Sequence, residues 1–465
     1  MDSMDYGVLT PAWAGTPAAA QATDAAFVQA MLDVEAAWVR VQADAGLCSA
    51  QDALAVTAIA RVEKYDLVSL AARTPDGANA LIPLLGMMRA ALKESGAAAS
   101  ASTALHRGAT SQDIIDTALM LIASRTLAVA TGPLRRAADG LATLAQAHRS
   151  TVCVARSLTQ HALPMTFGLR AANWLSALLA ATRQLEAARL PLQWGGAVGT
   201  LASLDQFLAV RETIATSGEL SDKLAEELGL SNPGVPWHGN RIPVTTLGAA
   251  LGGVIAALGT FGADVLTASR PEIAELSEPR EAGKGGSSAM PQKQNPVHSV
   301  LLRNAGFSAP GLVATLFTAA GTAVDERPDG GWHSEWSALR ELLRLAAGAA
   351  DHAATLAEGL NVHEDKLLSN LQLSGDAVLS ERIATVLAPI FPGGKPAIQQ
   401  LVIDSLTGST RLRDLLRSQL PVSACSDADL DNLLDPSGYL GSADRFITHV
   451  LAEFSAWKES WQPQH

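Results

Sequence analysis

The sequence is poor in cysteine, in aromatic residues and in charge. Its 465 residues include only 3 cysteines, 5% aromatic and 17% charged residues, whereas 48% are hydrophobic. Cys48, Cys153 and Cys425 lie far apart without metal-ligand spacing, which argues against a disulfide framework and against a cysteine zinc site. Few aromatics combined with abundant alanine and leucine predict a mostly helical protein.

Basic charge is also scarce. The formal net charge is −12 at pH 7, from 34 Lys and Arg against 46 Asp and Glu. A surface for nucleic acid or for an anionic membrane needs a net basic face, so neither partner is expected. An anionic substrate must therefore be met by a local cluster of Arg and Lys side chains.

The N-terminal residues MDSMDYGVLTP contain no basic or apolar segment of the kind that directs secretion. Together with the odd number of cysteines, this predicts a cytoplasmic protein. Two uncharged stretches, 242–263 and 304–324, are long enough to span a bilayer. Gly, Thr and Ala dilute both stretches, and both lack aromatic and basic flanks. We therefore expect them at the centre of a bundle or between subunits, and no membrane partner.

Helical periodicity extends through most of the chain. Thr23 predicts the cap of an early helix, and a second start is expected at Thr110 or Ser111. The helix after that second start is expected to continue to about residue 150, with a kink at Gly132-Pro133. Further long helices are expected at about 164–190, 203–229, 242–276, 296–326 and 332–360.

The chain is longer than a typical single domain. Long helices in succession predict a central bundle, flanked by regions of shorter helices. The expected fold is all-α and has three helical domains. These are an N-terminal domain at 1–105, a central long-helix bundle at 106–370 and a C-terminal domain at 371–465.

Three segments between the long helices concentrate polar residues. They run from His106 to Asp113, from Arg156 to His161 and from Gly286 to Pro296. The third follows a glycine-rich stretch, whose backbone reaches conformations closed to other residues. It ends on Asn295-Pro296, which predicts a helix cap followed by proline at the first helical position. This pattern is typical of a mobile loop attached to a rigid helix.

The third segment satisfies G-S-x-x-M-x-x-K-x-N, the pattern of the fumarase/aspartase superfamily, and the other two segments match the superfamily as well. The resemblance covers the chain after about residue 20. Within the superfamily the chain resembles the bacterial 3-carboxy-cis,cis-muconate cycloisomerases. The phrases that carry it are HRGATSQDIIDTA, SLTQHALPMTFG, PREAGKGGSSAMPQKQNPVHS and ERPDGGWHSEWSALRELL.

The resemblance implies a homotetramer in which three subunits each contribute one segment to every active site. It also implies that a small tricarboxylate, 3-carboxy-cis,cis-muconate, is closed to 4-carboxymuconolactone in the β-ketoadipate route of aromatic catabolism. No cluster of His and carboxylates has metal-ligand spacing, and no glycine motif follows a strand. Neither a metal nor a cofactor is therefore expected.

The implied reaction is an elimination run backwards, which needs a proton-transfer group and groups that bind negative charge. Ser287 matches the loop serine of the superfamily and is the expected proton-transfer residue, helped by Lys293, with His161 as a second acid/base or orienting group. Positive charge for carboxylates is expected from His106, Arg241, Arg327 and Arg340. The other expected substrate-binding residues are Thr110, Ser111, Gln112, Asn295, Ser288, Met290, Trp332 and His333.

These residues also have ordinary structural interpretations: 106–113 as a capped helix start, His161 as a hydrogen-bonded structural residue and Trp332 as a core residue. Compared with adenylosuccinate lyases, Ser157-Leu158 replaces a Thr-His pair and Asn79-Ala80 replaces His-Asp. The missing histidines argue against release of an amine, because the usual general acid is absent. A fumarate-releasing lyase of the same fold and a non-catalytic, crystallin-like protein stay open as alternatives.

Overall fold

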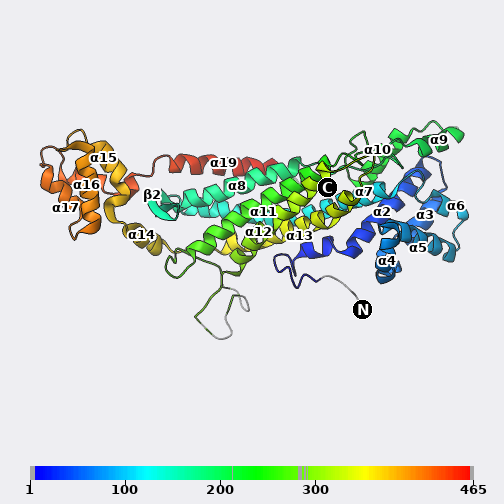
Figure 1. Cartoon of the computed structure of the whole chain (residues 1–465), viewed down its shortest axis with the longest axis horizontal. Helices are drawn as coiled ribbons and strands as arrows, with labels where there is room; N and C mark the ends of the chain where they lie inside the picture. The colour runs from blue at the N-terminus through cyan, green and yellow to red at the C-terminus, as the bar shows by residue number, and fades with distance from the viewer. Residues whose placement is uncertain (1–5, 212, 281–284, 287–289, 291, 461–465) are drawn as a thin grey trace.

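The protein is an elongated helical molecule, with long rods in the middle and shorter helices at both ends (Figure 1). The structure is a computed structural model and describes residues 6–211, 213–280, 285–286, 290 and 292–460. It confirms the all-α prediction, to which it adds two small antiparallel sheets among the described residues.

The end that carries the N-terminus is built from short helices around α2 (Asp24–Asp44). The hydroxyl of Thr23 accepts the N–H of Ala26 at 3.1 Å, which confirms the predicted cap. The other elements here are α1 (Pro17–Gln21), α3 (Ala50–Ile59), α4 (Leu67–Arg73), α5 (Leu81–Glu94) and α6 (Ala99–Ala104), with 3₁₀ turns at Val62–Lys64 and Thr74–Gly77.

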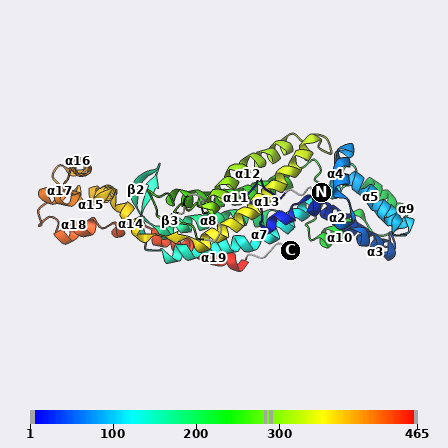
Figure 2. The same ribbon diagram turned by 90° about the horizontal axis from the view of Figure 1, so that it is seen from below.

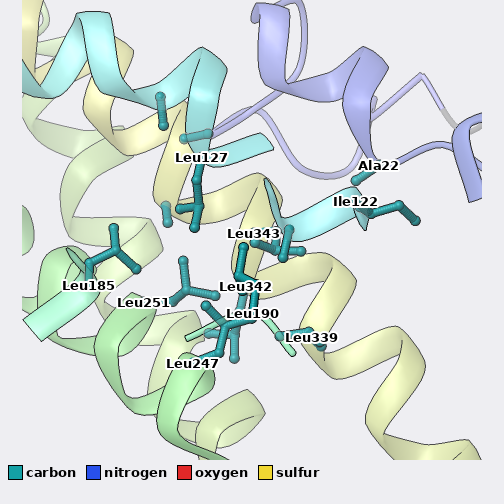
Figure 3. Close-up of a cluster of buried hydrophobic side chains, with 14 of the residues drawn as sticks. Ala22, Ile122, Leu127, Leu185, Leu190, Leu247, Leu251, Leu339, Leu342 and Leu343 are labelled. Carbon is teal, nitrogen blue, oxygen red and sulfur yellow. The ribbon is translucent and has the colours of Figure 1, made fainter. Parts of the chain in front are cut away.

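Five long helices form the central bundle. α7 has 37 residues, remains one helix through Pro133, and is therefore about 55 Å long. The rods pack through leucines such as Leu127, Leu251 and Leu342, which are buried and meet between the helices (Figure 3). The helices are α7 (Ser111–Ala147), α8 (Phe167–Ala187), α11 (Ile242–Ala268), α12 (Val297–Gly321) and α13 (Gly330–Gly359).

Three predicted helix boundaries are wrong. The segment 203–229 is two helices, α9 (Ala202–Val210) and α10 (Ser217–Leu228), because Thr216 and Glu219 form a capping box that starts α10. Helix α11 ends at Ala268, well before residue 276. Helix α12 begins at Val297, so Pro296, and not Asn295, takes the N-cap position.

A β-hairpin follows α7 where the sequence predicted a loop. Strand β1 (Val152–Ser157) pairs antiparallel with β2 (Gln160–Thr166) and leaves Leu158 and Thr159 as the turn. Both turn residues have positive φ, 50° and 70°, as in the type I′ turns whose twist suits a two-residue hairpin. A second small sheet pairs β3 (Leu276–Ser277) with β4 (Asn361–Val362).

The opposite end of the molecule has a hydrophobic core of its own, built from residues between Leu371 and Tyr439 together with Val152 and Val154 of β1. Its elements are α14 (Glu364–Gln372), α15 (Ser380–Leu387), α16 (Gly394–Thr407), α17 (Leu412–Gln419) and α18 (Asp427–Leu433), with 3₁₀ turns at Gly375–Leu379 and Pro436–Gly438. Helix α19 (Ala443–Ser460) leaves this region and runs back along the bundle (Figures 1 and 2). It packs on α7 and α8, so the predicted C-terminal domain includes one helix of the bundle.

In the described part of the chain, three helices are apolar and long enough, by length and composition alone, to cross a membrane: α7, α11 and α12. In this fold 78% of the apolar window of α7 and 56% of that of α11 are buried, but only 22% of that of α12. Phe307 and Phe317 on α12 are 72% and 53% exposed. Helix α12 therefore carries an apolar outer face that this chain alone does not cover.

Candidate active site

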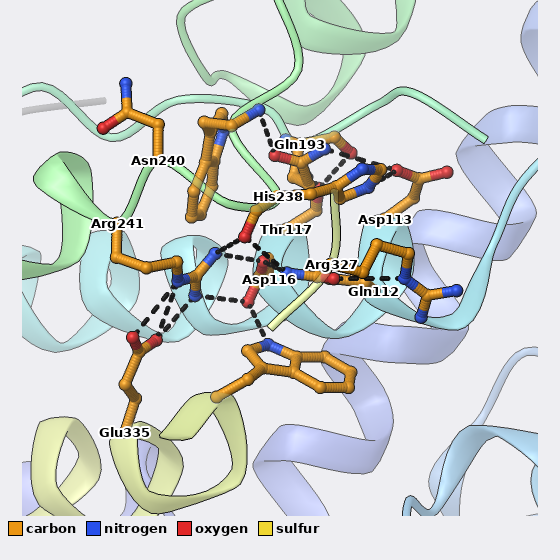
Figure 4. A network of polar contacts seen from close by, with 12 residues as sticks. Gln112, Asp113, Asp116, Thr117, Gln193, His238, Asn240, Arg241, Arg327 and Glu335 are labelled. Atoms are coloured by element: carbon orange, nitrogen blue, oxygen red, sulfur yellow. Dashed lines mark hydrogen bonds and ion pairs between the residues drawn. The ribbon is translucent and has the colours of Figure 1, made fainter. Parts of the chain in front are cut away.

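The first polar segment leads into the N-terminus of α7, where several predicted site residues converge. Thr110 is the N-cap residue, and its N–H donates to the Asp113 carboxylate at 2.9 Å. The guanidinium of Arg327, from the segment between α12 and α13, donates to the hydroxyls of Thr110 at 2.8 Å and Ser111 at 3.3 Å. Its Nε donates to the amide oxygen of Gln112 at 3.2 Å (Figure 4).

All three hydrogen-bond partners of Arg327 are neutral. Within the described part of the chain, its guanidinium forms no ion pair. The side chain is only partly buried, and the positive end of the α7 dipole lies beside it. A planar cation between two hydroxyls at a helix N-terminus is suited to binding a carboxylate.

Gln112 has a different position from the one predicted. Its side chain is fully buried, and its amide nitrogen donates to Asp116 Oδ2 at 3.2 Å and to the backbone oxygen of His238 at 3.0 Å. With its oxygen on Arg327, the amide has partners on both sides. Within this chain the Gln112 side chain supports Arg327, and its predicted contact with a substrate stays a prediction.

Arg241, another predicted substrate-binding residue, belongs to the same buried cluster. Its guanidinium is completely buried and bonds to Asp116 at 2.7 and 3.0 Å and to Glu335 at 2.6 to 3.1 Å. Burial alone lowers the pKa of Arg241, but the two carboxylates outweigh it and raise the pKa further above its usual range. Both carboxylates form ion pairs with Arg241 within this chain, so its positive charge is already balanced.

Trp332 and His333 lie next to this buried cluster. Trp332 is 4% exposed and donates its indole N–H to Asp116 at 2.8 Å, so its interpretation as a core residue fits the structure. The ring of His333 lies 5.1 Å from that of Trp332, and its Nδ1 is 3.1 Å from the backbone oxygen of Asp329. Both side chains support the start of α13, and His333 is the more accessible one.

Asp113 fastens a distant loop to the same helix end. Its carboxylate accepts the N–H groups of Gly195 and Gly196, both at 2.9 Å, and lies 2.8 Å from Nε2 of the buried His238. Gly196 has φ +69° and lies so close that an added Cβ would sit 3.0 Å from the oxygen of Gly108. The sequence marked Asp113 only as a first-turn acid, and nothing in it indicated His238.

His106 occupies the turn before α7 and contacts a carboxylate that the sequence analysis missed. Its Nδ1 lies 2.7 Å from Glu35 on α2. Burial alone lowers the pKa of His106, but the charge of Glu35 and the hydrogen bond to it outweigh burial, so the pKa lies above its ordinary value. A glutamate three residues before Trp38, within an apolar helix face, was the signal that was available.

Arg340 lies apart from this cluster. It is on α13, and its guanidinium pairs with Asp24 at the start of α2. Both side chains reach solvent, with 33% and 79% of the side chains exposed. The structure therefore does not bring Arg340 to Arg327, and the predicted contact with a substrate carboxylate is not supported within one chain.

The second polar segment is the β-hairpin at the far end of α7. Nδ1 of His161 lies 2.9 Å from the hydroxyl of Ser374, near α14. Arg156 donates to the fully buried Glu275 at 2.6 and 3.0 Å, and Arg170 also pairs with Glu275. Burial alone raises the pKa of Glu275, but the Arg156 and Asn370 hydrogen bonds and the two arginine charges hold it below its ordinary value.

The third segment begins close to Glu275 and ends at α12. Asn295 donates its N–H to the oxygen of Gly285 at 2.8 Å, and Gly286 bridges Gln294, so the two sides of the loop meet there. Glu278 fixes the start of α12 by accepting the N–H groups of His298 at 3.0 Å and Ser299 at 2.7 Å.

Among the predicted residues of this loop, Lys293 is exposed, Asn295 is half-buried and Met290 is 42% exposed. Ser287 and Ser288, the predicted proton-transfer residue and its neighbour, lie outside the described residues. Their predicted roles stay predictions.

The three segments do not meet within one chain. The Arg156–Glu275 pair joins the hairpin to the stem of the third loop, so these two lie at the same end of the bundle. The Arg327 cluster lies at the other end of α7, about 55 Å away by helix length. Within the described ranges, no group of three or more His, Cys, Asp or Glu side chains has metal-binding geometry.

Comparison with known proteins finds relatives along almost the whole chain. A family model described as lyase matches residues 17–311. Nitrosuccinate lyase from Streptomyces davaonensis is 40% identical over 455 residues, which cover 96% of this chain and 95% of the relative. The 3-carboxy-cis,cis-muconate cycloisomerase from Pseudomonas aeruginosa is 40% identical over 449 residues, 95% of each chain.

Solved structures show the same architecture. The crystal structure of 3-carboxy-cis,cis-muconate lactonizing enzyme from Pseudomonas putida matches with a TM-score of 0.84 at 34% identity. The match covers 94% of this chain and 96% of that one. The similarity therefore extends over both ends of the molecule as well as the bundle.

Proposed function

Because this chain belongs to the lyase family, that is, to the fumarase/aspartase superfamily, and is an enzyme of it, we propose that it adds a carboxylate across a carbon–carbon double bond. The proposed reaction converts 3-carboxy-cis,cis-muconate to 4-carboxymuconolactone in the β-ketoadipate route of aromatic catabolism. The observation that carries the proposal is Arg327 at the N-terminus of α7, a cation whose partners among the described residues are all neutral.

The lactonisation balances without a cofactor. One substrate carboxylate oxygen forms a bond to the alkene carbon, and the alkene electron pair moves into the neighbouring carboxylate, which becomes an aci-carboxylate group with two negative charges. A proton then goes to the adjacent carbon. We propose Ser287 as the group that transfers this proton, with Lys293 and Asn295 holding a second carboxylate and helping to stabilise the charge.

We further propose that Arg327, Thr110 and Ser111 bind a carboxylate that does not react. The guanidinium supplies the charge, and the two hydroxyls lie within 3.3 Å of it. Binding energy at this remote group orients the reacting carbons relative to the proton-transfer group.

A complete site requires more than one chain, and we propose a homotetramer. Two observations support it: the separation of the Arg327 cluster from the other two segments, and the apolar outer face of α12. Apolar patches of this kind are typical of interfaces between subunits. In the assembly, the N-terminus of α7 from one subunit would face the hairpin and the third loop of others.

A second candidate is elimination of nitrite from nitrosuccinate, which the 40% identity to nitrosuccinate lyase favours equally. A base would remove the proton next to a carboxylate, and nitrite would leave with the C–N bond electrons, giving fumarate. Nitrite is a stable anion that needs no proton to leave. Leu158, 93% exposed at the hairpin tip where amine-releasing relatives have histidine, is compatible with either reaction.

The test gives purified enzyme each substrate in parallel. Loss of the diene's ultraviolet absorbance reports lactonisation, and a nitrite assay reports elimination. We expect loss of the diene. Nitrite release alone would transfer the assignment to the second candidate, and a folded tetramer inactive on both substrates would remove both.

Ser287→Ala is expected to lower kcat by about 10²- to 10⁴-fold, because the proton-transfer group is lost. The matched control is Ser418→Ala, an exposed serine on α17, which should retain wild-type activity. Equal activity in both variants would exclude Ser287 from proton transfer.

A further inference from the structure

Glu35 and His106 form a carboxylate–imidazole pair beside the N-terminus of α7. The Glu35 side chain is 0% exposed, whereas that of His106 is 17% exposed. One carboxylate oxygen lies 2.7 Å from Nδ1, and the other accepts the backbone N–H of His106 at 2.9 Å. A single buried carboxylate thus holds both the ring and the backbone of one histidine.

The backbone of His106 is in the left-handed region, with φ 58°. This conformation costs free energy in a residue that carries a Cβ atom. The bond from the His106 N–H to Glu35 offsets part of that cost, because it is made in this conformation. The result places the imidazole four residues before Thr110, at the turn that leads into the Arg327 cluster.

The pair also sets the proton positions on the ring. Nδ1 carries the proton that it donates to Glu35, so Nε2 is the nitrogen left for another partner. Among the residues that the structure describes, none makes a hydrogen bond to Nε2. When the ring is protonated, Nε2–H becomes a charged donor.

The charged groups around this ring favour protonation. Glu35 on α2 and Asp113 on α7 stabilise the imidazolium, while Arg89 on α5 opposes it. The two acidic groups and the hydrogen bond outweigh both Arg89 and burial, so the pKa is raised. His161, at the other end of the bundle, has a hydroxyl partner instead of a carboxylate.

We infer that Glu35 is a positioning residue that keeps His106 as a cationic donor to a substrate carboxylate, so that substrate affinity falls as the pH rises through the His106 titration. The inference rests on the proposed function, because it places the substrate at the N-terminus of α7. It adds a pH-sensitive cation to the permanent charge of Arg327, and it assigns Glu35 a role that acts through His106.

Two measurements on the full-length enzyme test this. The first is an NMR titration of ¹³Cε1-labelled histidine, with His106→Gln identifying the resonance, which needs no substrate. The second is kcat and KM for 3-carboxy-cis,cis-muconate across the same pH range. In Glu35→Gln we expect the His106 midpoint to move to lower pH. At pH values above that midpoint, we also expect the KM of the variant to be about tenfold higher than that of the wild type, with kcat little changed.

One control is Glu35→Asp, which keeps the negative charge and should return the His106 midpoint part of the way to its wild-type pH. The other is Asp33→Asn, which should leave the midpoint unchanged because its partner Arg125 is outside the site. An unchanged midpoint in Glu35→Gln overturns the inference, as does a wild-type KM that does not depend on pH. If the His106 midpoint shifts in Glu35→Gln but the wild type does not turn over 3-carboxy-cis,cis-muconate, the Glu35–His106 pair is supported and the proposed function is refuted. If Glu35→Gln does not fold, a pH-independent KM in His106→Gln supports the inference, and a pH-dependent one overturns it.

Discussion

The two ends of α7 differ in how their charges are arranged. At the N-terminal end, Asp113, Asp116, Arg241 and Glu335 are all buried, and each has a partner within this chain. At the C-terminal end, one buried carboxylate, Glu275, fixes the hairpin, but the side chains available for chemistry lie near the surface.

This difference shows that the residues around Arg327 are fixed by folding of this chain, and in the proposed tetramer the hairpin and the third loop would complete the site. The buried cluster positions Arg327 through Gln112 before any partner is present. The hairpin and the third loop are anchored at their stems, while Leu158 and Lys293 extend into solvent. Mutations at the two ends should therefore affect different properties of the enzyme.

The largest effect is expected for Arg241→Ala. This change leaves Asp116 and Glu335 buried without their cation, which should lower the free energy of unfolding by about 3–5 kcal/mol. Denaturant unfolding measures it. Arg136→Ala is the control, because its pair with Glu358 is exposed and worth about 0–1 kcal/mol. Equal losses in the two variants would contradict the role assigned to the buried cluster.

Glu275→Gln is expected to be intermediate, at about 1–3 kcal/mol, since it weakens the bonds to Arg156 and Arg170. The folded pKa of Glu275 is lowered, so its contribution is present above the ordinary glutamate pKa of about 4.3 and is lost as the pH falls. The thermal midpoints of wild type and variant should therefore converge in acid. The control Glu272→Gln changes an exposed side chain and should have the wild-type thermal midpoint at every pH. If the difference in thermal midpoint between wild type and Glu275→Gln does not narrow in acid, the stabilising role of the Glu275 carboxylate is refuted.

Arg327→Gln is expected to have the smallest effect on stability, under about 1 kcal/mol, because only neutral partners are lost. Its effect on KM should be about 10- to 100-fold, from loss of a charged hydrogen bond to a substrate carboxylate. The control Arg136→Gln removes an exposed pair outside the predicted site and should change neither quantity. A large loss of stability with unchanged KM would make Arg327 structural.

Much of the fold was predictable because it depends on local signals. The caps at Thr23 and Thr110, and the long apolar periodicity after them, mark α2 and α7 correctly. The hairpin was missed because its strands are short and carry polar residues and a proline, Pro164, that resemble a loop. Its turn also uses Leu158 and Thr159 instead of the glycine and asparagine that usually mark such turns.

The candidate site was predictable in part. The sequence predicted Thr110, Ser111 and Arg327 as substrate-binding residues without pairing them, and the structure brings the three together. It did not show that Arg241 is buried, because its partner Glu335 is 94 residues away and only the tertiary fold joins them. Residue type indicates which chemistry is available, whereas long-range packing decides which groups remain free for a ligand.

The unbroken α7 has a consequence for how this chain tolerates change in length. A single residue inserted midway along the helix would turn everything beyond it by about 100° and advance it by about 1.5 Å. The two halves of α7 could then not both keep their packing, with Gln112 and Asp116 on Arg327 and Arg241 at one end and the buried Leu141 at the other. We therefore expect this chain to tolerate substitutions on the exposed side of α7 better than insertions within the helix.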